Sequence, residues 1–134
     1  RIVLFVATGL VCGAAHAAQW VAFGDDVHLD VDSIRTVDAT APVVAAWFKL
    51  TGDLGRYPDK PKAVQCKTRI EANCKTGELR QRGNHLYDRK GQVVHQNFET
   101  SPWMSPPPES HAELMMGAAC AAWAKLKAAG LLPN

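Results

Sequence analysis

The sequence lacks a strong charge of either sign and lacks the common signatures of catalysis. Its formal net charge is only +2 over 134 residues, so we expect no nucleic-acid partner, because such proteins carry a clear positive excess. The chain has no G-x-S-x-G, no H-E-x-x-H and no phosphate-binding glycine loop. His85 and His95 have no serine or cysteine partner with a diagnostic neighbourhood. We therefore expect a protein that is not an enzyme.

The sequence also lacks an apolar run long enough to cross a bilayer, which takes roughly 20 residues. Its main apolar run, residues 2–11, follows Arg1 and precedes an A-x-A site that ends at Ala17. This order is typical of a secretory signal peptide, so we predict a signal peptide over residues 1–17, cleaved between Ala17 and Ala18. The mature chain, residues 18–134, should form one domain with no integral membrane segment.

Export to the periplasm follows from this leader, with the cell surface or secretion as alternatives. Cys12 could instead be a lipid anchor, but Val11 stands before it where a small residue is needed. We therefore favour the site at Ala17.

The pattern of the mature chain changes from strands to a helix. Ser110 and Glu113 form a capping box, the helix should span residues 111–129, and Gly130 ends it. The residues expected on its apolar stripe are Leu114, Met115, Ala118, Ala119, Ala122, Trp123 and Leu126. Residues 32–35 should form a turn capped by Asp32. The strand candidates are residues 20–23, 27–31, 42–50, 63–74, 78–88 and 92–99.

Glycines mark the turns between the last three strand candidates. Gly77 and Gly91 supply the positive φ that tight hairpins need, so these strands should form an antiparallel meander. The predicted fold class is α+β, an antiparallel meander sheet with one C-terminal α-helix packed on it.

Three cysteines remain after the leader, Cys66, Cys74 and Cys120, and an oxidising compartment favours a disulfide between two of them. Cys66 and Cys74 lie on one strand face about 26 Å apart, so they cannot bridge each other in a regular strand. A bond from Cys120 in the helix to one of the two strand cysteines is expected. The third thiol should pack as a small core residue.

No metal or cofactor is expected. The three cysteines match no compact zinc motif. His111 and Met115 stand one helical turn apart, as copper or haem ligands can, but Met115 fits the core better. The acidic stretch around His28 lacks the glycine and glutamate of an EF-hand, and its acids are Asp25, Asp26, Asp30 and Asp32.

Lysines supply a basic surface that could meet acidic partners, although a solvated face is the simpler interpretation. They are Lys60, Lys62, Lys67, Lys75 and Lys90.

Several short motifs, taken in order, resemble the bacterial surface-adhesin protein E family over nearly the whole mature chain. They are Trp20, residues 32–35, Trp47, residues 73–74, residues 87–91, Trp103, residues 108–110 and Cys120. The resemblance implies about six strands, a disulfide between Cys74 and Cys120, and no counterpart for Cys66. The family's named member is an outer-membrane lipoprotein adhesin that binds host matrix proteins and plasminogen.

The resemblance implies a non-enzymatic exported binding protein that contacts host matrix or envelope proteins. This chain departs from the family's named member because it has no convincing lipidation site. The alternative is a periplasmic structural or stress-associated protein without a host ligand. No oligomeric state is predicted.

Overall fold

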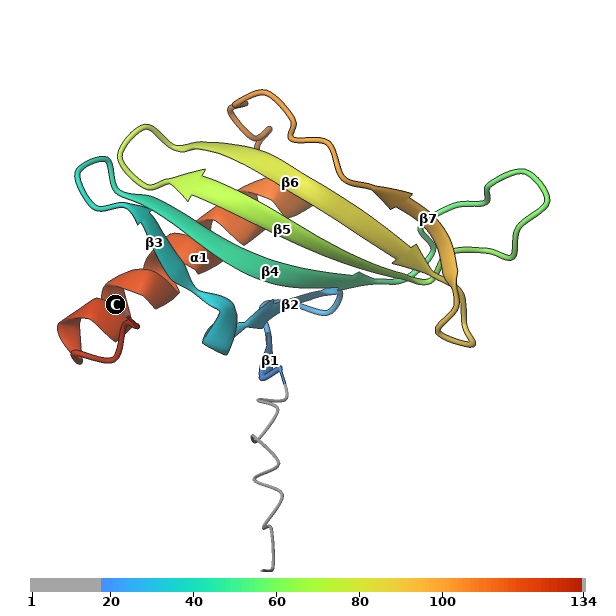
Figure 1. Ribbon diagram of the computed structural model, residues 1–134, viewed down its shortest axis with the longest axis horizontal. Helices are drawn as coiled ribbons and strands as arrows, with labels where there is room; N and C mark the ends of the chain where they lie inside the picture. The colour runs from blue at the N-terminus through green and yellow to red at the C-terminus, as the bar shows by residue number, and fades with distance from the viewer. Residues whose placement is uncertain (1–17, 134) are drawn as a thin grey trace, which may run out of the picture.

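The structure, a computed structural model, describes residues 18–133. The predicted signal peptide, with Cys12 and Ala17, lies outside the described residues, so export and cleavage before Ala18 stay predictions. A twisted antiparallel sheet forms most of the molecule, and one long helix crosses behind it (Figure 1). This arrangement confirms the predicted α+β class. Within the described residues, no helix is both long and apolar enough to cross a membrane.

The sheet has seven strands in the order β1-β2-β4-β5-β6-β7, and β3 pairs with β4 off that path. β2 and β3 pair with the same side of β4, where Val27 lies opposite Leu50 and Arg35 opposite Ala45. The strands are β1 (Trp20–Ala22), β2 (Val27–Asp30), β3 (Arg35–Asp38), β4 (Val43–Thr51), β5 (Gln65–Asn73), β6 (Glu78–Tyr87) and β7 (Val93–Asn97).

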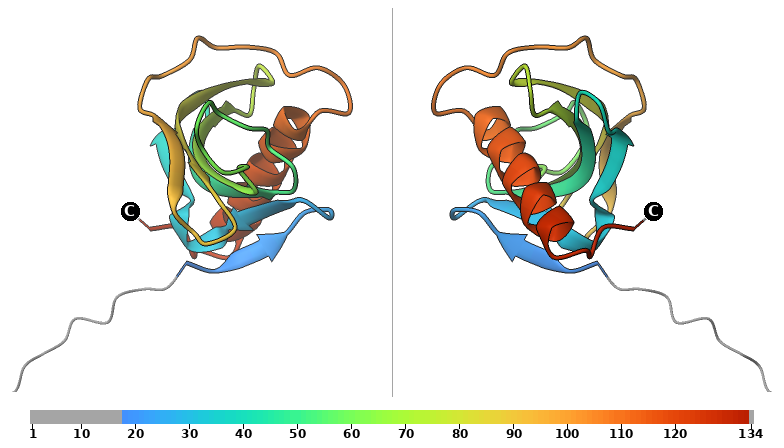
Figure 2. Two further views of the ribbon diagram at one scale, coloured as in Figure 1. Left: turned by 90° about the vertical axis from the view of Figure 1, so that its right-hand side faces the viewer. Right: turned by 90° about the vertical axis from the view of Figure 1, so that its left-hand side faces the viewer.

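Helix α1, His111–Ala128, begins at the predicted cap and covers one face of the sheet (Figure 2). The Ser110 side chain accepts the Glu113 N–H at 3.1 Å, but the Glu113 carboxylate accepts the N–H of Glu109 and not that of Ser110. The helix buries Met115, Ala118 and Ala119 against the sheet. The predicted stripe was wrong at Leu114, which is 40% exposed because it lies at the edge of the contact with the sheet.

The core lies between α1 and the sheet. Alternate residues of β4 and β5 point toward the helix, and Phe48 and Ile70 are almost completely buried there. Each large apolar side chain buried in this way contributes roughly 1.5–3 kcal/mol. The apolar run of β4 and the period-two pattern of β5 are why the central sheet could be predicted from sequence.

The segment between β2 and β4 differs from the prediction. Val31–Ser33 forms a 3-10 helix capped by Asp30, whose Oδ1 accepts the Asp32 N–H at 3.2 Å, so the predicted cap at Asp32 was wrong. The strand β3 that follows was not predicted. All of its residues are exposed, so it carries no hydrophobic alternation, and its pairing with β4 holds it in place.

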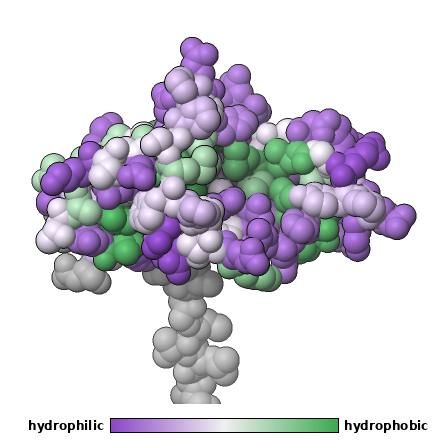
Figure 3. Space-filling view, turned by 90° about the horizontal axis from the view of Figure 1, so that it is seen from above, coloured by the Kyte–Doolittle hydropathy of each residue, from purple (hydrophilic) through white to green (hydrophobic). Residues whose placement is uncertain are grey.

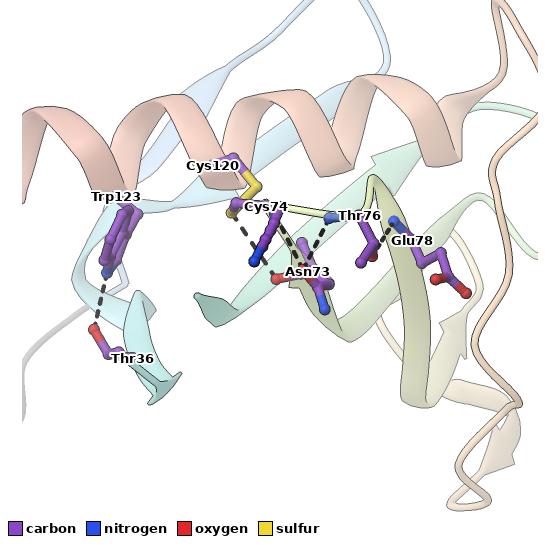
Figure 4. Close-up of a disulfide and its surroundings, with 9 residues drawn as sticks. Thr36, Asn73, Cys74, Thr76, Glu78, Cys120 and Trp123 are labelled. Atoms are coloured by element: carbon purple, nitrogen blue, oxygen red, sulfur yellow. Dashed lines mark hydrogen bonds between the residues drawn. A yellow bond between two sulfur atoms is a disulfide. The ribbon is translucent and has the colours of Figure 1, made fainter. Parts of the chain in front are cut away.

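A disulfide between Cys74 and Cys120 fastens α1 to the sheet just beyond the end of β5, with the Cα atoms 5.7 Å apart (Figure 4). A hydrogen bond of 2.8 Å from Trp123 Nε1 to Thr36 Oγ1 adds a second link from the helix to β3. In the chain-entropy model, closing a loop of 46 residues lowers the entropy of the unfolded chain and so stabilises the folded protein by about 4 kcal/mol.

Cys66 is a buried free thiol near the opposite end of β5, opposite Leu50 and Leu86 on the neighbouring strands. Burial raises the pKa of this thiol, which keeps it protonated. Cys66 therefore packs as a small core side chain.

Candidate functional site

The face of the sheet opposite α1, here called the open face, is turned toward the viewer in Figure 1. Because side chains alternate along a strand, the residues between the core positions point to this face. On β4 these include Trp47 and Lys49, and on β5 they include Lys67 and Arg69. Cationic and aromatic side chains therefore lie together on one surface.

Strand register places two lysines directly opposite each other on the open face. Lys49 of β4 pairs with Lys67 of β5, and this lysine pair is flanked by His28 on β2 and His85 on β6. Like charges at directly opposite positions destabilise a sheet, by an amount similar to the roughly 0.2–1 kcal/mol that opposite charges contribute. The lysine pair is therefore expected to lower the stability of the sheet slightly.

Aromatic rings hold the two lysines in position. The Lys49 Nζ lies 4.8 Å from the ring centroid of Trp20, and the Lys67 Nζ lies 5.4 Å from that of Tyr87. Within residues 18–133, neither lysine has a carboxylate oxygen within 4.0 Å. Cation–π contact restricts long side chains without neutralising their charge, so both ammonium groups remain free to bind an anion.

An aromatic cluster continues the surface from the lysine pair toward β7. The rings of Trp47 and His85 lie 6.1 Å apart, and those of His85 and Phe98 lie 5.4 Å apart, edge to face. Seen from above, hydrophobic and hydrophilic groups are mixed on the surface (Figure 3), and the segment after β7 exposes Phe98, Trp103 and Met104. Phe98 is 74% exposed, so it is available for contact with a partner.

A buried acid on the same face is neutralised by arginines. Glu71 is only 3% exposed, and its two carboxylate oxygens lie 2.7 Å from Arg80 Nε and 3.3 Å from Arg82 Nη1. The Arg80 guanidinium also stacks over Trp103 at 4.6 Å. Glu71 therefore orders this arginine pair and leaves the face with a positive excess.

The lysines predicted as a basic surface are divided among four places. Lys60 and Lys62 lie in the loop before β5 and Lys90 in the β6–β7 hairpin, whereas Lys75 lies in the turn after β5 and only Lys67 is on the open face. Lys49 and Arg69, which share the open face with Lys67, were not among the basic residues predicted from the sequence. Their alternation with Trp47 and Lys67 was visible, but the strand register that joins them was not.

The other candidate ligands occupy separate places. His28 lies on the open face, Asp30 caps the 3-10 helix, and His111 is exposed whereas Met115 is buried. In the part of the chain that the structure describes, no three His, Cys, Asp or Glu residues form a group that could hold a metal ion. The expectation of no metal or cofactor stays a prediction.

Comparisons with known proteins agree with this fold. The family model for surface-adhesin protein E matches residues 20–121. The structure of Haemophilus influenzae protein E is 22% identical, with a TM-score of 0.55, covering 79% of this chain and 86% of that one. Protein E from non-typeable Haemophilus influenzae is 20% identical, with a TM-score of 0.56, covering 90% and 86%. No match was found among the curated proteins.

Proposed function

This chain belongs to the surface-adhesin protein E family, and on that premise we propose that it is a non-enzymatic exported protein that binds an acidic protein partner through its open face. The partner belongs to the host matrix or the bacterial envelope. The observation that carries the proposal is the Lys49–Lys67 pair, which is positioned by rings and left without acidic partners within residues 18–133.

Two further features support a protein partner. Aromatic and arginine side chains are enriched where proteins meet, and the open face carries both beside the lysine pair. The rings restrict the lysines before binding, which reduces the entropy lost when a partner orders them.

Export is supported by the disulfide and by the family. Disulfides such as Cys74–Cys120 persist in oxidising compartments, whereas disulfides are rare in the bacterial cytosol. We place the protein first in the periplasm. Cell fractionation tests this location, and N-terminal sequencing should find Ala18 as the first residue. A lipid-modified Cys12 at the start would overturn the assigned cleavage site.

Binding is tested with purified protein on immobilised host matrix proteins and envelope proteins. The double variant Lys49→Ala/Lys67→Ala should bind at least tenfold more weakly, a loss of about 1.4 kcal/mol. Its matched control, Lys125→Ala/Lys127→Ala, removes the same charge from α1 and should bind like the wild type. Equal loss in both variants, or in neither, would contradict the proposed face. A periplasmic protein that binds none of these partners would favour the structural alternative.

A further inference from the structure

A second positively charged region lies next to the open face, in a pocket between the loop that follows β4 and the β6–β7 hairpin. Both segments are at the right-hand end of Figure 1. The pocket has a volume of about 320 Å³. Two cations from each segment line it: Arg56 and Lys62 from the loop, Arg89 and Lys90 from the hairpin.

The hairpin is built to present its two cations. Asp88, 6% exposed, accepts the N–H groups of Lys90 and Gln92 through Oδ1, each at 2.9 Å. Gly91 adopts a φ of 79°, which favours glycine, and donates its N–H to the Asp88 carbonyl at 3.0 Å. Arg89 and Lys90 are therefore exposed on a turn whose own hydrogen bonds fix its shape.

The pocket keeps a positive excess. Lys62 pairs with Asp53 at 2.6 Å, but Arg56, Arg89 and Lys90 have no carboxylate within 4.0 Å among residues 18–133. Four like charges brought together repel one another, and Asp53 and Asp88 offset part of that charge. Such a concave positive site concentrates anions, and arginine binds carboxylate or sulfate in a forked geometry.

Three residues of the pocket, Pro61, Val64 and Asp88, offer no backbone N–H to the main chain of a peptide. The N–H of Val64 is donated to the Tyr87 carbonyl at 2.9 Å and that of Asp88 to the Gln92 carbonyl at 2.9 Å, and Pro61 has none. An added strand would need such groups free. Val64 and Pro61 instead supply apolar surface beside the cations. The volume lies at the lower end of small-molecule sites, about 300–1,000 Å³, so a bare ion would leave most of it empty.

We propose that this pocket binds one negatively charged sugar unit of an acidic polysaccharide. Its sulfate or carboxylate group lies among the arginines and lysines, and its ring packs against Pro61 and Val64. The pocket is close to the open face, because Tyr87, the ring under Lys67, directly precedes Asp88. A polysaccharide leaving the pocket can therefore reach Lys67. This site goes beyond the protein partner proposed above.

Calorimetric titration of the purified protein with a sulfated disaccharide and with an unsulfated uronic-acid disaccharide tests the proposal. At least one should bind, and which of them binds identifies the anionic group. Arg89→Gln/Lys90→Gln should weaken that binding at least tenfold, because it removes two of the four cations that line the pocket. Both residues are exposed, so the double variant should leave the fold intact. Lys125→Gln/Lys127→Gln is the charge-matched control and should bind like the wild type.

Four results would overturn the proposal: no binding of either sugar, equal loss in the hairpin variant and its control, inorganic sulfate binding as tightly as the disaccharides, or an acidic peptide binding more tightly than both. The Lys49→Ala/Lys67→Ala variant separates the two sites. It should lose the protein partner and keep the disaccharide, so that either function can fail without the other.

Discussion

The two faces of the central sheet are made by the same strands but differ in burial and in charge. On the covered face, Phe48 and Ile70 are almost completely buried under α1. On the open face, their neighbours Lys49 and Arg69 have no acidic partner within 4.0 Å among residues 18–133, and Lys49 faces another lysine across the strands. Adjacent positions therefore contribute differently: one stabilises the core, and the other belongs to the surface that we propose for binding. Substitutions on the two faces should affect the free energy of unfolding and the affinity for a partner independently.

The largest effect is expected on the covered face. Phe48→Ala should lower the free energy of unfolding by about 3–5 kcal/mol, because it leaves a cavity at a fully buried position. Lys49→Ala, one residue away on the open face, should change it by no more than about 0.5 kcal/mol. Chemical denaturation measures both. Similar losses in the two variants would remove the distinction between the faces.

The second-largest effect is expected from loss of the Cys74–Cys120 disulfide, which fastens the helix to the sheet. Cys74→Ala should lower the free energy of unfolding by about 2–4 kcal/mol and lower the melting temperature, with helix signal lost early, because the 46-residue loop is no longer closed. Circular dichroism during heating measures this.

Cys66→Ala is the matched control, since it removes a buried sulfur but no bond, and it should cost about 1 kcal/mol. Peptide mapping without reductant should find Cys74 linked to Cys120. A linkage from Cys66 to Cys120 would contradict the assignment.

Glu71 is an open-face residue whose substitution should lower the free energy of unfolding, as substitutions on the covered face do. Glu71→Gln keeps the shape but removes the charge that Arg80 and Arg82 share, so we expect a loss of about 1–2 kcal/mol. Urea denaturation of this variant beside Glu78→Gln, whose acid forms no ion pair within residues 18–133, measures the difference. No difference between them would mean that the ion pairs of Glu71 with Arg80 and Arg82 do not contribute to stability.

The smallest expected change in the free energy of unfolding is an increase, caused by a substitution at Lys67. Lys67→Glu places an acid opposite Lys49 and should raise the free energy of unfolding by up to about 0.5 kcal/mol. The same variant should lose affinity for the acidic partner, more than Lys67→Gln does. A variant that is more stable and still binds fully would show that the lysine pair is not kept for binding.

Much of this fold followed from local patterns. The helix start at Ser110, the hairpin glycines and the alternation in β4 and β5 each depend on a few neighbouring residues, so the sequence predicted them. Strand β3 was missed because its exposed residues carry no pattern. The predicted basic surface was incomplete, because the five lysines singled out are spread over four places and Lys49 was not among them.

Alternation along a single strand determines which side chains share a face, and the sequence alone contained that information for Phe48 and Lys49. Which side chains meet across strands depends on register, and register is set by how the buried faces of all the strands pack together. Only the tertiary structure therefore decided that Lys49 lies opposite Lys67 and that Arg56 and Arg89 line one pocket. The pairing of Cys74 with Cys120 was already expected from the family resemblance, and the structure confirms it. A contact between residues distant in the sequence depends on how the whole chain packs, and no short segment determines that packing by itself.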